Sequence, residues 1–158
     1  MRNKSKKKQT KESVWDYPRP PRAEYTNKHV KVIAGGEVIS ESTRTIRVLE
    51  TSHPPVYYFP PEDVRMDRLT EGERKTLCEW KGCARYYTIT VAGKRIENSA
   101  WFYSNPWPPY TILQHYIAFY PHLMDSCYVD GELVRPDPNL YYGGWITNDI
   151  LGPFRRSP

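Results

Sequence analysis

Long apolar runs are absent from the 158-residue sequence. A helix that crosses a bilayer needs roughly 18 consecutive apolar residues, and no stretch approaches that length. The first residues also lack the short apolar segment of a secretory signal. We therefore expect a cytoplasmic protein with no membrane partner.

Cysteine is scarce, with only Cys78, Cys83 and Cys127 in the chain. An odd number of cysteines without an export signal argues against a disulfide framework, so we expect reduced thiols. No C-x-x-C pair occurs, and a structural zinc site would need histidines from distant segments. We therefore predict no metal site from this pattern.

Alanine and leucine, which favour helices, are also few, whereas the chain holds 13 tyrosines, 15 prolines and 5 tryptophans. This composition favours strands and irregular connections. The sequence therefore predicts one all-β domain over residues 13–158, with antiparallel sheets and one or two short helices.

Acidic residues are missing from residues 1–11, which hold six basic side chains. Because this segment has no apolar residue beyond Met1, we expect residues 1–12 to form a disordered basic tail. The tail accounts for the net charge of +5 and leaves the rest of the chain close to neutral. The charge thus predicts no specific nucleic-acid partner, although loose contact of the tail with phosphates stays open.

An internal repeat bears most on the architecture. The stretches "VKVIAGGEVISES" at 30–42 and "YTITVAGKRIENS" at 87–99 both have the pattern of a strand, a glycine turn and a second strand. Each runs on into alternating residues and a proline-rich corner. We predict a duplicated antiparallel unit, with copies at about 28–66 and 84–120.

Further strands are expected at 56–59, 84–91, 117–120, 127–134 and 143–147. The Asp-Gly pair at 130–131 lies between alternating flanks and predicts a two-residue hairpin turn. Residues 126–154 should therefore supply a hairpin and a closing strand. Short helices are plausible at 109–116, after a proline, and at 61–69.

Several blocks resemble the motifs of domain of unknown function family 427. They are "ESVWDYPRPPR", "STRTIRVLETSHPPVYYFPPEDVRMD", "LCEWKGCARYYTI", "ENSAWFYSNP", "IAFYP" and "YYGGWIT". The resemblance implies a tandem β-tent fold, and the family is sometimes labelled nucleotidyltransferase-like. Related branches of the fold bind zinc or use an aromatic pocket, so an aromatic pocket is implied here. The sequence departs from the family pattern at Glu79, where proline is usual.

Candidate site residues lie along "RTIRVLETSHPPVYY". In a strand, Arg44 and Glu50 would end one apolar face, on which Ile46 and Val48 also lie. Charged groups beside buried positions are usually paired or functional. The proline corner that follows would hold polar side chains rigidly. A structural ion pair and a ligand site both explain this pattern.

The segment "TLCEWKGCARYY" adds a second set of candidates. Lys81 precedes a glycine, where the backbone permits close approach of a ligand, and Cys78 lies three residues earlier. A lysine near a cysteine can activate the thiol or serve as an anion contact. A surface turn beside an inert cysteine is the alternative.

We expect a cleft between the two copies that binds a small planar or anionic metabolite. The expected ligand-binding residues are Arg44, Glu50, His53, Tyr57, Lys81 and Trp101. If the protein is an enzyme, Cys78 is the candidate nucleophile and His53 or Glu50 the general base. One alternative is a nucleotidyltransferase-like enzyme, with magnesium held by carboxylates among Glu50, Glu62, Asp63 and Asp67. Another is a non-catalytic interaction protein. No other cofactor is predicted, and the oligomeric state stays open.

Overall fold

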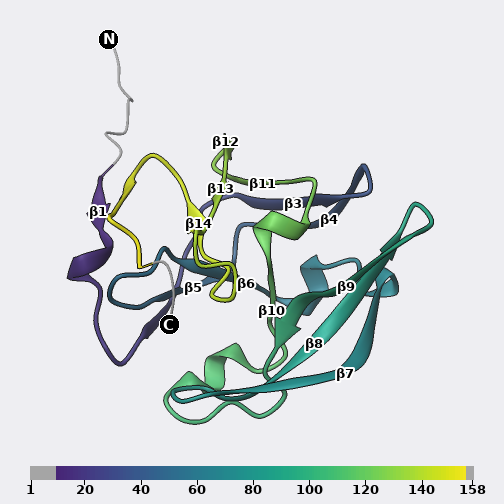
Figure 1. Cartoon of the computed structure of the whole chain (residues 1–158), viewed down its shortest axis with the longest axis horizontal. Coiled ribbons are helices and arrows are strands. Elements are labelled where there is room, and N and C mark those ends of the chain that lie inside the picture. Colours follow the sequence, from purple (N-terminus) through teal and green to yellow (C-terminus); the bar gives the residue numbers. More distant parts are fainter. Residues whose placement is uncertain (1–9, 156–158) are drawn as a thin grey trace.

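Antiparallel strands make up most of the protein, as shown by a computed structural model that describes residues 10–155 (Figure 1). The larger sheet has seven strands in the order β2 (Arg22–Tyr25), β5 (Ile46–Leu49), β6 (Val56–Phe59), β10 (Ile117–Phe119), β9 (Lys94–Phe102), β8 (Gly82–Val91) and β7 (Leu69–Cys78). The smaller sheet has the order β12 (Glu132–Leu133), β11 (Ser126–Val129), β3 (Val30–Ala34) and β4 (Glu37–Ser42). The predicted all-β class is confirmed.

Two short strand pairs complete the sheets of the described residues. Strand β13 (Arg135–Pro136) pairs with β14 (Trp145–Ile146), and β1 (Glu12–Ser13) runs parallel to β15 (Ile150–Leu151). The helical segments are single 3-10 turns: η1 (Val14–Asp16), η2 (Pro61–Asp63), η3 (Met66–Arg68), η4 (Tyr110–Leu113) and η5 (Pro121–Leu123). Over residues 10–155, no helix has the length and apolar character needed to cross a membrane.

The predicted glycine-turn hairpins form at both expected places. Strands β3 and β4 join through Gly36 and strands β8 and β9 join through Gly93, with φ angles of 75° and 74°. The Asp-Gly turn joins β11 to β12, also as predicted. The β3–β4 hairpin lies in the smaller sheet and the β8–β9 hairpin in the larger one. A duplicated β-tent stays a prediction.

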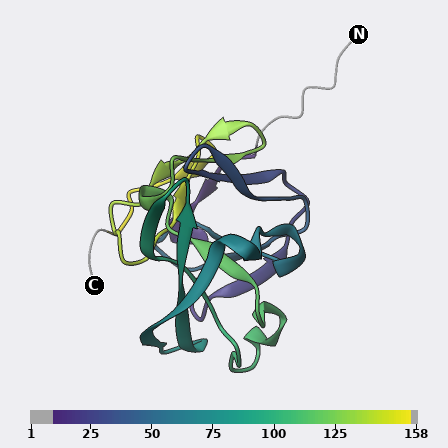
Figure 2. The same cartoon turned by 90° about the vertical axis from the view of Figure 1, so that its right-hand side faces the viewer.

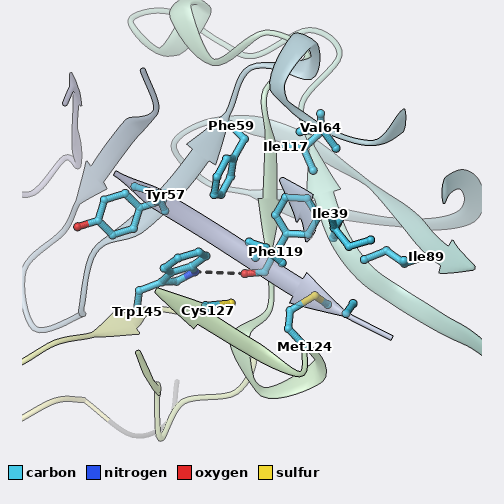
Figure 3. Packing of buried hydrophobic residues seen from close by; sticks show 14 of the residues in the cluster. Ile39, Tyr57, Phe59, Val64, Ile89, Ile117, Phe119, Met124, Cys127 and Trp145 are labelled. Carbon is cyan, nitrogen blue, oxygen red and sulfur yellow. Dashed lines mark hydrogen bonds between the residues drawn. The ribbon is translucent and has the colours of Figure 1, made fainter. Parts of the chain in front are cut away.

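Side chains of the two sheets interleave to form the main core. In Figure 1 the smaller sheet crosses the upper part of the molecule above the strands of the larger sheet, and Figure 2 shows the same arrangement turned by 90°. Figure 3 shows the packing of Phe59, Phe119 and Trp145, where the Trp145 indole donates to the Phe119 carbonyl at 3.3 Å. This core covers one face of the larger sheet.

A second apolar cluster covers the opposite face of the larger sheet. Because side chains alternate along a strand, Tyr57 and Phe59 of β6 enter the main core while Tyr58 enters this second cluster. Strand β9 alternates in the same way, and its Trp101 joins the second cluster together with Tyr103, which follows the strand. Most of the functional candidates lie on this second face.

Glu12, which was predicted to belong to the disordered tail, is part of a strand. Residues 1–9 of the expected disordered segment lie outside the described residues, but Glu12 already belongs to β1. Its carboxylate accepts two hydrogen bonds of 3.0 Å from the buried Arg47 guanidinium. Arg47 also donates to Glu24 at 2.9 Å, so this ion-pair cluster ties β1 and β2 to β5.

Candidate functional site

Two adjoining hollows open on the second face of the larger sheet. The inner cavity, of about 170 Å³, is lined by Glu50, Tyr58, Lys81, Tyr86, Trp101 and Tyr103, among others. The outer pocket, of about 480 Å³, is lined by Arg19, His53, Glu79, Trp80, Asn139 and Arg155, among others. Five side chains line both hollows: Glu50, Leu77, Cys78, Tyr141 and Tyr142. We call the two hollows together the cleft.

Strand alternation makes the walls of the inner cavity aromatic. Tyr58 comes from β6, Tyr86 from β8, and Trp101 from β9, each on the face away from the main core. The Trp101 indole donates a hydrogen bond of 3.2 Å to the Tyr58 hydroxyl, and the two rings meet edge to face. A cavity of roughly 150 Å³ is large enough to hold one benzene ring, so the inner cavity can accept a single aromatic ring.

Lys81 brings a positive charge into this aromatic cavity. It lies in the turn between β7 and β8 and is only 6% exposed. Its Nζ lies 3.5 Å from Cys78 Sγ and 6.0 Å and 5.9 Å from the ring centres of Tyr103 and Tyr110. Within residues 10–155, no carboxylate oxygen lies within 4.0 Å of this ammonium. An anion in the cavity would compensate the charge.

Contacts with Trp107 hold the turn that carries Lys81 in place. The Lys81 carbonyl accepts a hydrogen bond of 3.0 Å from the backbone of Trp107. Gly82 has a φ of 103°, and a Cβ at this position would lie 3.1 Å from the Trp107 indole nitrogen. Glycine is therefore needed for the close approach of the Trp107 ring to the turn.

Tyrosine hydroxyls around the cavity stay protonated at neutral pH. Burial raises the pKa of Tyr58, Tyr103 and Tyr142 above the ordinary value for tyrosine. A protonated hydroxyl can donate a hydrogen bond to an oxygen of a ligand. The walls therefore offer neutral donors beside the single ammonium.

Glu50 lies where the inner cavity meets the outer pocket. Its carboxylate accepts a hydrogen bond of 3.2 Å from the Tyr142 hydroxyl and forms an ion pair with Arg19 at 3.6 Å. The Tyr142 ring stacks on His53 with ring centres 4.0 Å apart. Glu50 is thus oriented by partners from two other segments.

The surroundings of His53 favour its neutral form. Burial lowers the pKa of its imidazole, and the charges of Arg155, Arg19 and Lys81 act in the same direction against the opposing effect of Glu50. Its Nδ1 is buried without a hydrogen-bond partner among the described residues, and the Trp80 Nε1 is in the same situation. Both residues line the outer pocket, which makes them candidates for ligand contact.

The loop at 137–144 supplies the wall that sequence reasoning missed. Asp137 accepts hydrogen bonds from the backbone of Asn139 at 2.9 Å and of Gly144 at 3.1 Å, which closes the base of the loop. Tyr141, near the tip, is 79% exposed and lines both hollows. The paired tyrosines before Gly-Gly were the available signal, but they gave no indication of which distant strands the loop covers.

Two of the predicted ligand-binding residues lie away from the cleft. Arg44 pairs with Asp63, with two hydrogen bonds of 2.9 Å, at an exposed position before β5. Tyr57 faces the main core beside Trp145, because alternation along β6 assigns the cleft to Tyr58 instead. The structure brings the other candidates together: Glu50, His53, Cys78, Lys81 and Trp101 all line the cleft.

The sequence patterns also failed to predict the ten-residue strand β7, whose end forms one side of the cleft. Its sequence, "LTEGERKTLC", is too polar to show an apolar alternation, as befits a strand at the edge of a sheet. Near its end, Leu77 is 73% exposed and lines both hollows. The cleft therefore has exposed apolar side chains on two sides, from Leu77 and Tyr141.

The carboxylates suggested for magnesium do not gather at one place. Asp63 binds Arg44, and Asp67 binds Arg65 at 3.0 Å, while Glu50 lies in the cleft. In the part of the chain that the structure describes, no three His, Cys, Asp or Glu side chains are arranged to hold a metal ion.

Comparison with known families identifies the chain. The model of a family described as domain of unknown function (DUF427) matches residues 22–130, more than half of the sequence. The chain belongs to the DUF427 family. Strands β2 to β11 of this DUF427 protein lie within the match, and the loop at 137–144 lies beyond it. The first and last of the motifs that suggested the family also extend outside the matched residues. A comparison with curated proteins found no match.

Proposed function

We propose that the protein binds a small planar anion in the cleft, with its ring in the inner cavity and its negative charge against Lys81. The observation that carries this proposal is the buried Lys81 ammonium in an aromatic cavity, without a carboxylate partner among the described residues. Leaving a charge in such a place costs stability unless a ligand compensates it. Trp101 and the tyrosines then pack against the ring.

The size of the cleft limits the ligand. One ring fills the inner cavity of about 170 Å³, and any further group extends into the outer pocket of about 480 Å³. There the Trp80 ring lines the wall, and this second group would pack against it. We also propose a cytoplasmic location, supported by the three free cysteines at positions 78, 83 and 127.

Thermal-shift measurements with matched ligands test the proposal. Benzoate and benzamide have the same ring and differ in charge, so benzoate should raise the melting temperature and benzamide should not. Ligand at about 100 Kd adds roughly 2.7 kcal/mol of stability. For a chain of this length, that corresponds to an increase of about 5–10 °C.

Variants show whether the cleft is responsible. Lys81→Met should remove the shift caused by benzoate, whereas Lys94→Met, at an exposed lysine of the β8–β9 hairpin, should preserve it. Equal shifts for benzoate and benzamide, or a shift retained in Lys81→Met, would refute the proposal. A nucleotide that stabilises the protein only with magnesium would favour the nucleotidyltransferase-like alternative. No shift with any planar anion of a broader panel would favour an interaction protein.

A further inference from the structure

Cys78 and Lys81 form a chemical pair on the wall of the inner cavity. Cys78 ends β7 and Lys81 ends the following turn, so the hairpin itself brings the sulfur and the ammonium to 3.5 Å. Both side chains line the inner cavity, and Cys78 also lines the outer pocket. A ligand that enters the cleft can therefore reach the thiol and the ammonium at once.

The other two cysteines lack this combination. Cys83 is exposed, and its nearest recorded partner is the carbonyl of Ala84 at 3.9 Å. Cys127 is buried in the main core, where burial raises the pKa of its thiol well above the usual range. A thiol reacts as its thiolate, and a neighbouring ammonium is one of the surroundings that favours this form. Among the residues that the structure describes, Cys78 alone of the three has an ammonium at hydrogen-bonding distance within a cavity.

We infer that Cys78 is a nucleophile that adds to planar α,β-unsaturated carbonyl compounds bound in the cleft. The inference rests on the proposed ligand cleft. Cys78 releases its thiol proton to solvent, its thiolate forms a bond to the β-carbon, and the electrons of the carbon–carbon double bond move to form an enolate. The Lys81 ammonium stabilises the charge on the enolate oxygen, gives one proton to the α-carbon and regains a proton from solvent. No leaving group, oxidant or further reactant is needed.

The shape of the cleft selects this class of electrophile. A conjugated enone or enal is flat, as an aromatic-walled cavity for one ring requires. The charge that develops on its oxygen appears in the cavity that Lys81 and Tyr103 line. Donors directed at developing charge stabilise the transition state more than the bound reactant.

The three cysteines provide an internal comparison for the test. The full-length protein is treated with 4-phenylbut-3-en-2-one, and adducts at each cysteine are followed by peptide mass spectrometry. Although Cys78 is less exposed than Cys83, we expect it to react about tenfold faster or more, a modest part of the 10²–10⁴-fold effect of a positioned proton donor. Equal rates, or a faster Cys83, would overturn the inference.

Variants separate activation from simple access. Lys81→Met should slow the reaction at Cys78 about tenfold and leave Cys83 unchanged, whereas Lys94→Met should change neither rate. Lys81→Arg keeps a positive charge beside the Cys78 sulfur, so its reaction rate should exceed that of Lys81→Met. An unchanged Cys78 rate in Lys81→Met, measured on a protein shown by circular dichroism to be folded, would refute the role of the lysine.

Benzoate distinguishes this inference from the proposed function. Benzoate should protect Cys78 from the probe and leave Cys83 unprotected, because it occupies the same cavity. Benzoate binding without preferential reaction at Cys78 would overturn the inference and leave the proposed function standing. Rapid reaction at Cys78 in a protein that binds no planar anion would instead count against the proposed function alone.

Discussion

Replacing Lys81 by methionine should make the protein more stable while it weakens ligand binding. Methionine has a similar length and no charge, so it fills the same space between Cys78, Tyr103 and Tyr110. A residue retained for the fold would show the opposite effect on stability. The sign of the change therefore separates a functional role from a structural one.

The magnitude follows from the surroundings of the ammonium. Removing an ion from water costs several kcal/mol, and Lys81 is only 6% exposed. The two aromatic rings return about 0.5–2 kcal/mol each through cation–π attraction. The sulfur at 3.5 Å is a weak acceptor and returns little more. We expect a net gain of about 1–2 kcal/mol in Lys81→Met, within the range found when apolar residues replace buried charges.

Urea unfolding monitored by tryptophan fluorescence measures this gain. The midpoint should rise at an unchanged m value, and the melting temperature should rise by about 3–6 °C. Lys94→Met is the control, and its stability should stay within about 0.5 kcal/mol of the parent. A loss of more than about 1 kcal/mol in Lys81→Met would show that the lysine supports the fold and would refute the reasoning.

Three further predictions concern the surroundings of the cleft. Because burial lowers the folded-state pKa of His53 below its unfolded value of 6.5, the unfolded chain takes up the proton first, so stability should fall as the pH drops from 7 through this unfolded value. His53→Phe should reduce that slope in urea titrations at pH 7 and pH 5. Gly143→Ala should cost about 2 kcal/mol or more in thermal unfolding, because φ is 71° and the added Cβ would lie 2.6 Å from the Tyr120 ring; a cost below about 0.5 kcal/mol would contradict this packing. Arg47→Met should cost about 1–3 kcal/mol, since Glu12 loses its ion pair and Glu24 keeps only Arg22, and an unchanged urea midpoint would show that this cluster contributes nothing.

Local chemistry made most of the fold predictable. Glycine turns at Gly36 and Gly93 and the Asp-Gly pair at 130–131 specify hairpins through backbone angles that the nearest residues decide. The proline-rich corner after β5 and the apolar strand β6 were likewise readable, because proline ends strands wherever it occurs. The helix expected at 109–116 was wrong in extent, since only the single turn η4 forms before Gln114.

The sheet face on which a side chain lies, and the residue with which a charged group pairs, were harder to predict. "VYYF" at 56–59 is apolar throughout, so no alternation distinguishes Tyr57 from Tyr58, and only the packing of two sheets assigns one to the core and the other to the cleft. Arg44 was expected in the cleft, yet Asp63, nineteen positions later, binds it. Such partners depend on contacts between distant segments, which local patterns do not encode.

The sequence by itself determined that this protein is an antiparallel β domain, because turns and strand propensities act over a few residues. It also placed Cys78 and Lys81 near each other, since three positions in a hairpin turn bring side chains together whatever the rest of the fold. Only the tertiary structure decided that Lys81 is buried in an aromatic cavity, which requires Trp101 from β9 and the loop around Tyr142 to converge on it. Burial gives that ammonium its significance, because a charge is costly only where distant segments exclude water from it.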